Sequence, residues 1–365
     1  MKNKKIIVLL ILSLSLLFIK TLVIKFASEN TEFIEKNYSR GIYPIISKAL
    51  TSISNKVPFS IGEVLVIVFV IGICVVTFKL ITYIIKKKYH KLILGISYMV
   101  FCSSLLFCIF DGVWLLNNYR TNIEDLMSLS IENNDKQALV DTFEALIIKT
   151  NSLRQELSED DNNLAWGLSK QEILHNAYKG YDGVNQQYDF IGKDIVLVKG
   201  LLSSPIQTMS GYTGIYLFFV GEPSVNIQAP IFTIPHTACH EIAHQKGFAQ
   251  EEAANYIGFL ACKNNEDLIF QYSGYFSAMT YVGNAIFTVD PQIYYELTAS
   301  YDEQVQNDIM YVREFWQRAQ KKATSKVANH LNDAYLKAYN QPEGIKSYGR
   351  FVDLLVADFI EDGDV

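Results

Sequence analysis

The hydrophobic residues of this chain are concentrated in three long runs near its start. The runs cover residues 6–24, 61–85 and 92–116, and each is long and apolar enough to cross a bilayer as a helix. The first run follows the basic start MKNKK, but no small-residue cleavage site follows it, so we interpret it as an uncleaved anchor. The pattern therefore predicts a multi-pass protein of the cell membrane, with a three-helix membrane anchor over residues 1–116.

The positions of the lysines predict how these helices are oriented. The segments KNKK at the start and KKKYHK after the second run are densely basic, whereas basic residues are scattered among acidic ones in residues 27–60. The positive-inside rule places both basic segments in the cytoplasm. After three crossings, residues 117–365 are expected to form an extracytoplasmic domain. Asp111 lies near the outer end of the third run, where we expect a structural role.

The outer part reads as helices with one short strand region. Apolar residues recur at helical spacing in residues 134–160 and again from residue 169. Residues 211–235 are rich in Gly, Pro, aromatic and β-branched residues and predict one or two short strands. Helical patterns return from Thr237. Residues 267–287 approach span length, but their polar interruptions favour a helix of the domain over a fourth crossing. The expected fold class is mainly α (α+β), with a small β element before the motif helix.

Charge and cysteine content add little. The formal net charge of −6 gives no basic face for nucleic acid, so none is expected as a partner. Only Cys239 and Cys262 belong to the outer part. They could form a disulfide in an extracytoplasmic domain, but two buried free thiols are the favoured interpretation.

Residues 236–255, HTACHEIAHQKGFAQEEAAN, contain three of the six histidines at four-residue intervals. In a helix, His240 and His244 project from the same face one turn apart, which suits two ligands of one zinc ion. Glu241 points away from that face but can reach a water at the metal, as the general base of an H-E-x-x-H site. The alternative is an amphipathic helix whose histidines bond within the core.

A catalytic zinc also needs a third protein ligand and one open position. Gly247 is the predicted end of the helix, so the chain can turn back and bring Glu251 or Glu252 to the metal. We favour Glu251, because Asn255 one turn later would face the same way and orient a ligand histidine. Both glutamates could instead be ordinary first-turn acids. His236 is expected at the rim, with a role as ligand or proton donor left open.

The segment HEIAHQKGFAQEEAANYIGFLAC resembles the signature of a bacterial family of unknown function described as membrane-bound zinc peptidases. GIYLFFVGEPSVN upstream, and YSGYFSAMTYV and SYGRFVDLLVA downstream, are similar to that family as well, so the resemblance covers nearly the whole chain. The E-x-x-A-N element further resembles the E-x-x-A-D of other membrane peptidases, whose first glutamate is a zinc ligand. The resemblance implies a zincin-like domain and supports the metal site more than any substrate.

The expected function is a membrane-anchored zinc metallopeptidase that acts on an unidentified peptide or protein. Residues 214–221 could form a peptide-binding edge strand or an internal strand. Candidates for stabilising the oxyanion are Tyr275, Tyr281, Tyr348 and Arg350. One rival is an intramembrane protease, which the polar flanks of the motif disfavour. The other is a non-catalytic sensor or scaffold with a structural metal or none.

Overall fold

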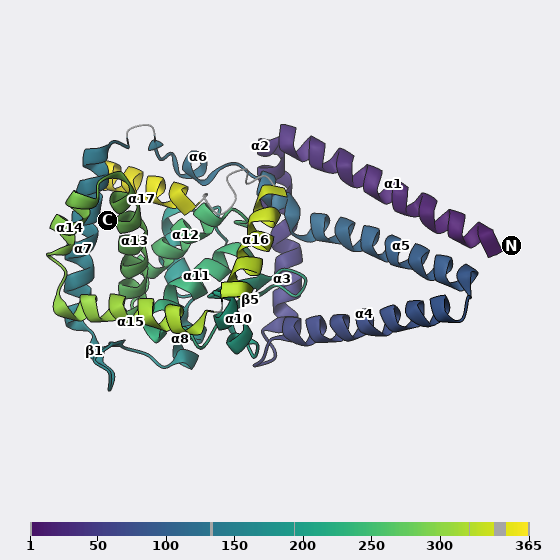
Figure 1. Ribbon diagram of the computed structural model, residues 1–365. Coiled ribbons are helices and arrows are strands. Elements are labelled where there is room, and N and C mark those ends of the chain that lie inside the picture. The colour runs from purple at the N-terminus through teal and green to yellow at the C-terminus, as the bar shows by residue number, and fades with distance from the viewer. Residues whose placement is uncertain (1, 132–133, 193, 321, 339–347, 364–365) are drawn as a thin grey trace.

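The computed structural model describes residues 2–131, 134–192, 194–320, 322–338 and 348–363. Three long helices project from a globular, mostly helical part (Figure 1): α1 (Lys2–Glu29), α4 (Ile61–Ile85) and α5 (Tyr89–Val113). Within the described chain, these three helices are long and apolar enough to cross a membrane, and at most 11% of each apolar window is buried. The three predicted spans are therefore confirmed by length and composition, although the third ends at Val113.

The three spans differ in how closely they pack against one another. Helix α1 lies along α5, and α4 returns beside α5 (Figure 1). Lys20 Nζ lies 3.1 Å from Asp111 Oδ1, so the charge of Asp111 near the outer end of α5 is paired across two helices. After α5, the chain continues as the 3-10 helix η2 (Leu115–Tyr119) into the globular part.

The segment between the first two spans is folded, although its sequence predicted no element. It forms α2 (Thr31–Phe33), the π-helix η1 (Ile34–Ile42) and α3 (Tyr43–Ser54). The buried residues of α3 are Tyr43, Ser47, Thr51 and Ser54, so this helix turns hydroxyl groups rather than apolar side chains toward the globular part. Hydrophobic periodicity therefore could not reveal it.

The helices that were predicted in the first half of the globular part start at residues with strong capping signals. Asp135 accepts a hydrogen bond from Ala138 N at 2.8 Å at the start of the long helix, and Ser169 and Glu172 form a capping box. The helices here are α6 (Ile123–Met127), α7 (Lys136–Glu156), α8 (Lys170–Asn176), α9 (Gly180–Gln187) and α10 (Ser204–Ser210).

The β structure is small, and its main hairpin lies where the Gly-rich and aromatic segment predicted it. β4 (Gly214–Leu217) pairs antiparallel with β5 (Glu222–Val225), and β3 (Lys199–Gly200) pairs parallel with β5. The strand order β3-β5-β4 leaves β4 at an edge of the sheet. A separate pair consists of β1 (Ser158–Glu159) and β2 (Ala165–Trp166).

The second half is helical, as predicted. Its elements are the 3-10 helix η4 (Ile231–Thr233), α11 (Ile234–Gln245), α12 (Glu251–Lys263), α13 (Leu268–Val289), α14 (Pro291–Thr298), α15 (Glu303–Ala319), α16 (Lys322–Ala338) and α17 (Tyr348–Asp362). Helix α13 packs on α7 and α12, and its Phe270, Tyr272 and Met279 are fully buried. This helix is thus part of the core and not a fourth crossing.

Two hydrophobic clusters organise the packing. The larger one fills the globular part around α7, α11, α12, α13 and α17. The smaller one joins the ends of the spans to the sheet and includes Tyr43, Trp114 and Tyr216. Cys239 and Cys262 are both buried, free thiols in the larger cluster.

Candidate metal centre

The motif helix and its neighbour are joined by a tight turn. Helix α11 has Pro235 in its first turn and ends at Gln245. Gly247 adopts a φ of +91°, a conformation that favours glycine, and Phe248 N then donates to Ala243 O at 3.1 Å. The reversal lets α12 begin at Glu251 and run back against α11.

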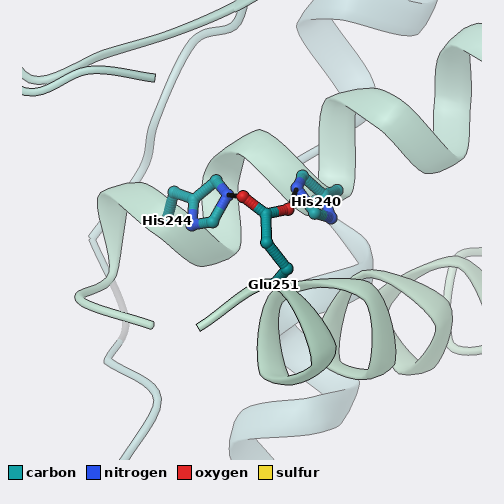
Figure 2. Close-up of side chains that lie close together, drawn as sticks. All are labelled: His240, His244 and Glu251. Atoms are coloured by element: carbon teal, nitrogen blue, oxygen red, sulfur yellow. Dashed lines mark ion pairs between the residues drawn. The ribbon is translucent and has the colours of Figure 1, made fainter. Parts of the chain in front are cut away.

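Three predicted ligands converge across this turn (Figure 2). His240 Nε2 lies 3.4 Å from Glu251 Oε2, and His244 Nε2 lies 3.8 Å from Glu251 Oε1. One ligand atom from each residue lies within 4.8 Å of the other two, and no second such group of His, Cys, Asp or Glu occurs among the described residues. Zinc bonds of about 2.1 Å at tetrahedral angles separate two ligands by about 3.4 Å. The three residues therefore fit a zinc ion after a small contraction.

The orientation of His244 suits a metal ligand. Its Nδ1 lies 2.7 Å from Phe248 O, so the Nδ1–H donates to this carbonyl and leaves Nε2 free on the side of Glu251. Burial, followed by the neighbouring His240, lowers the pKa of His244 to about 4. The imidazole is thus held neutral, the form that binds metals.

The side chain of His240 is positioned by residues of α12. Burial lowers its pKa, but the carboxylates of Glu251 and Glu241 raise it, and the net shift is upward. Asn255 is buried one helical turn after Glu251. Close approach of the helices at this point requires small residues: a Cβ on Gly258 would lie 3.0 Å from His240 N, and Ala254 is fully buried.

The two open alternatives for the third ligand lie elsewhere. Glu252 is buried beside Arg350 and Glu124, and burial raises its pKa to about 7. The ring of His236 stacks near Phe351 at 6.4 Å, and its Nε2 faces Asn255 O at 3.4 Å. Neither residue belongs to the group of three, and His236 lines the adjoining cleft.

Glu241 lies next to the group and faces the cleft. Its carboxyl group is buried, which raises its pKa to about 8 against the opposing effect of His240. Strand β4 lies directly against it, because a Cβ on Gly214 would be 2.4 Å from Glu241 Oε1. Glu241 Oε2 has no protein partner in the described part of the chain.

A cleft of about 990 Å³ opens over these residues. Of the four candidates for oxyanion stabilisation, Tyr281 lines it, whereas Tyr275 and Arg350 do not, and the side chain of Tyr348 lies outside the described residues. Burial, followed by Glu251, raises the pKa of Tyr281 to about 12, so its hydroxyl remains a donor.

Sequence reasoning missed several aromatic residues of the cleft, among them Tyr212 and Trp114. Tyr212 precedes β4, and its hydroxyl donates to Ala328 O at 3.0 Å. Trp114 follows α5 directly, and its ring centroid lies 6.0 Å from that of His244. Trp114 was assigned to a span, and no local signal linked it to a histidine far along the chain.

Residues 38–356 match the model of a family described as "Protein of unknown function (DUF3810)". The chain belongs to this DUF3810 family. The match includes α4, α5, the β4–β5 hairpin and all three residues of the candidate metal group. No curated protein and no solved structure matches the chain. The expected kinship with a family of unknown function is thus confirmed, and the link to zinc and peptide hydrolysis stays a proposal.

Proposed function

We propose that this DUF3810 protein is a membrane-anchored zinc metallopeptidase. The observation that carries the proposal is the convergence of His240, His244 and Glu251, with Glu241 beside them in an open cleft. Three ligands leave the fourth position for water or substrate, as in catalytic zinc sites, whereas structural sites are closed by four protein ligands.

Each residue of the site has a separate role in the proposed hydrolysis. Zinc, when bound by His240, His244 and Glu251, would supply Lewis-acid activation of water and of the substrate carbonyl. Glu241 accepts the proton of the attacking water and then donates it to the leaving amine. The Tyr281 hydroxyl, in the same cleft, is the candidate donor to the developing oxyanion.

The position of β4 supports a peptide as the substrate. This edge strand lines the cleft through Gly214, Ile215 and Tyr216, beside Glu241. An extended peptide can add to such an edge through main-chain hydrogen bonds. The absence of a side chain at Gly214 permits the backbone to approach Glu241 closely.

The charges at the ends of the spans support an extracytoplasmic domain. The N-terminus and the turn between α4 and α5, which carries Lys86, Lys87 and Lys88, lie at the ends of the spans far from the globular part (Figure 1). The positive-inside rule assigns this basic end to the cytoplasm. We infer that the globular part faces the opposite side.

Two rival functions fit the arrangement less well. An intramembrane protease carries its motif in a span, but α11 lies in the globular part, separate from α1, α4 and α5 (Figure 1). A structural zinc would need a fourth protein ligand. Cys239 instead points toward Ala177 O, at 3.6 Å, and His236 faces Asn255.

Replacing one residue tests the proposed chemistry. Glu241→Gln keeps the size of the side chain but cannot accept a proton, so we predict normal zinc content and a loss of peptide hydrolysis. Full-length wild type and variant, purified in detergent, would be incubated with a mixture of peptides from digested protein, and new termini would be read by mass spectrometry. Hydrolysis by Glu241→Gln at the wild-type rate would contradict the mechanism.

A further inference from the structure

The cleft over the metal group reaches the membrane spans. Phe110 lies in the last turn of α5 and Trp114 directly follows this span, and both line the cleft together with the metal-group residues. The ring centroid of Phe110 lies 4.8 Å from that of Phe218, and that of Trp114 lies 6.0 Å from that of His244. One end of the cleft is therefore aromatic and continuous with the surface of a span.

Helix α3 fixes the height of the motif helix above the bilayer. It runs across the base of the three spans (Figure 1). Tyr43 Oη and Ser47 Oγ each donate to Gln245 O at 3.0 Å, at the end of α11. The other face of α3 is solvent-exposed in the isolated chain. It carries Ile45 and Ile53, which are 71% and 62% exposed, together with the exposed Lys48 and Ser52. An amphipathic helix in this position lies in the membrane interface, so α11 is about one helix diameter, roughly 10 Å, above it.

The β4–β5 hairpin is attached to the start of a span. The fully buried Glu222 of β5 accepts hydrogen bonds from Ser60 Oγ at 2.8 Å, Ile61 N at 3.0 Å and Gly62 N at 2.9 Å. These groups form the N-terminus of α4, where the chain enters the apolar span. The edge strand β4 is thereby held at the membrane surface, next to its partner strand.

Amide side chains line the cleft as well. They belong to Gln207, Asn329 and Asn332, on α10 and α16. The cleft volume of about 990 Å³ is at the upper end of the range for small-molecule sites, which suits several residues of an extended chain. The cleft thus combines aromatic side chains next to a span with amide side chains from α10 and α16.

From these features, we propose the substrate class of this site, which rests on the peptidase function proposed above. The substrates are polypeptides that are themselves anchored in the membrane, and the cut falls in their extended juxtamembrane segment. An extended chain advances about 3.3 Å per residue, so the roughly 10 Å between α11 and the interface corresponds to about three residues, and the scissile bond lies within a few residues of the bilayer. A peptidase for soluble peptides has no need of a cleft that is open onto its own spans.

Three forms of one peptide library test this inference. Full-length protein in lipid vesicles would receive the library free in solution, joined to a span of about 20 apolar residues, or joined to this span through a semi-rigid spacer of about 20 Pro residues. We expect the directly anchored form to be cut at least about tenfold faster than the free form, close to the span. The spacer should abolish cutting of the displaced segment, although this form is equally concentrated at the membrane.

The outcomes separate the two proposals. The substrate class would be overturned if free and anchored peptides were cut at equal rates, or if the displaced segment were cut. The peptidase function would still stand in either case, provided that Glu241→Gln abolishes the cutting. No cutting of any form would remove both. Phe218→Ser should reduce the preference for the anchored form without changing zinc content, whereas Phe287→Ser, at a 45% exposed position of α13, should leave the preference intact.

Discussion

Residue 214 must be glycine for Glu241 to keep its position. A Cβ at this point of β4 would lie 2.4 Å from Glu241 Oε1 and 2.8 Å from Thr237 Cγ2, closer than real contacts allow. Because Glu241 would have to swing away, we predict that Gly214→Ala lowers hydrolysis by about tenfold or more while zinc is retained. Gly349→Ala is the control, since a Cβ there meets nothing within 4 Å. Wild-type activity in Gly214→Ala would show that β4 does not constrain the base.

Particular residues show which parts of the candidate site could be predicted from the sequence. His240 and His244 could be paired from their spacing alone, because a helix places residues four apart on one face. The choice of Glu251 over Glu252 depends on the residue at which α12 starts after the Gly247 turn. The spacing in the sequence limits this start to a few residues but does not determine it. The approach of Trp114 to His244 joins residues 130 positions apart and could not be predicted.

Among the elements, α7, α13 and α15 are tied together by one buried charge network. Arg154 Nε lies 2.8 Å from Asp308 Oδ2 with both side chains fully buried, and Tyr272 Oη donates to the same oxygen at 2.6 Å. Asp308→Ala leaves the guanidinium without this carboxylate, so we predict a loss of about 3 kcal/mol or more in the free energy of unfolding.

Thermal and denaturant unfolding of the full-length protein would measure this loss. The control is Arg318→Ala, which removes an exposed pair with Glu314 on the same helix, α15, and should change stability by less than about 1 kcal/mol. Equal, small effects of both substitutions would show that the buried network contributes no more than a surface pair.

Element prediction succeeded where one face was apolar or a cap was explicit. The spans, α7 with its Asp135 cap and α8 with its capping box carry such signals. Helix α3 carries the opposite pattern, because its hydroxyl face is buried and Ile45 and Ile53 point outward. Its pattern is explained only when both the globular part and the bilayer interface are considered.

In the whole molecule, the membrane anchor and the globular part depend on each other for stability. The predicted division at residues 116 and 117 cuts contacts between Ser47 and Gln245 and between Glu35 and Arg120, which is buried with Nε 2.9 Å from Glu35 Oε2. We therefore predict that the fragment 117–365 unfolds at a lower temperature than full-length protein and binds zinc substoichiometrically. A fragment with full-length stability and one zinc per chain would contradict this interdependence.

We propose that His240, His244 and Glu251 hold one zinc ion, and the metal content of the purified protein is the decisive test. Elemental analysis of full-length protein in detergent, after dialysis against trace zinc, would compare wild type with His244→Ala, Glu251→Ala and Glu252→Ala. We predict one zinc per chain in wild type and Glu252→Ala, and its loss in the other two variants. Folded wild type without zinc, or zinc retained in both His244→Ala and Glu251→Ala, would contradict it.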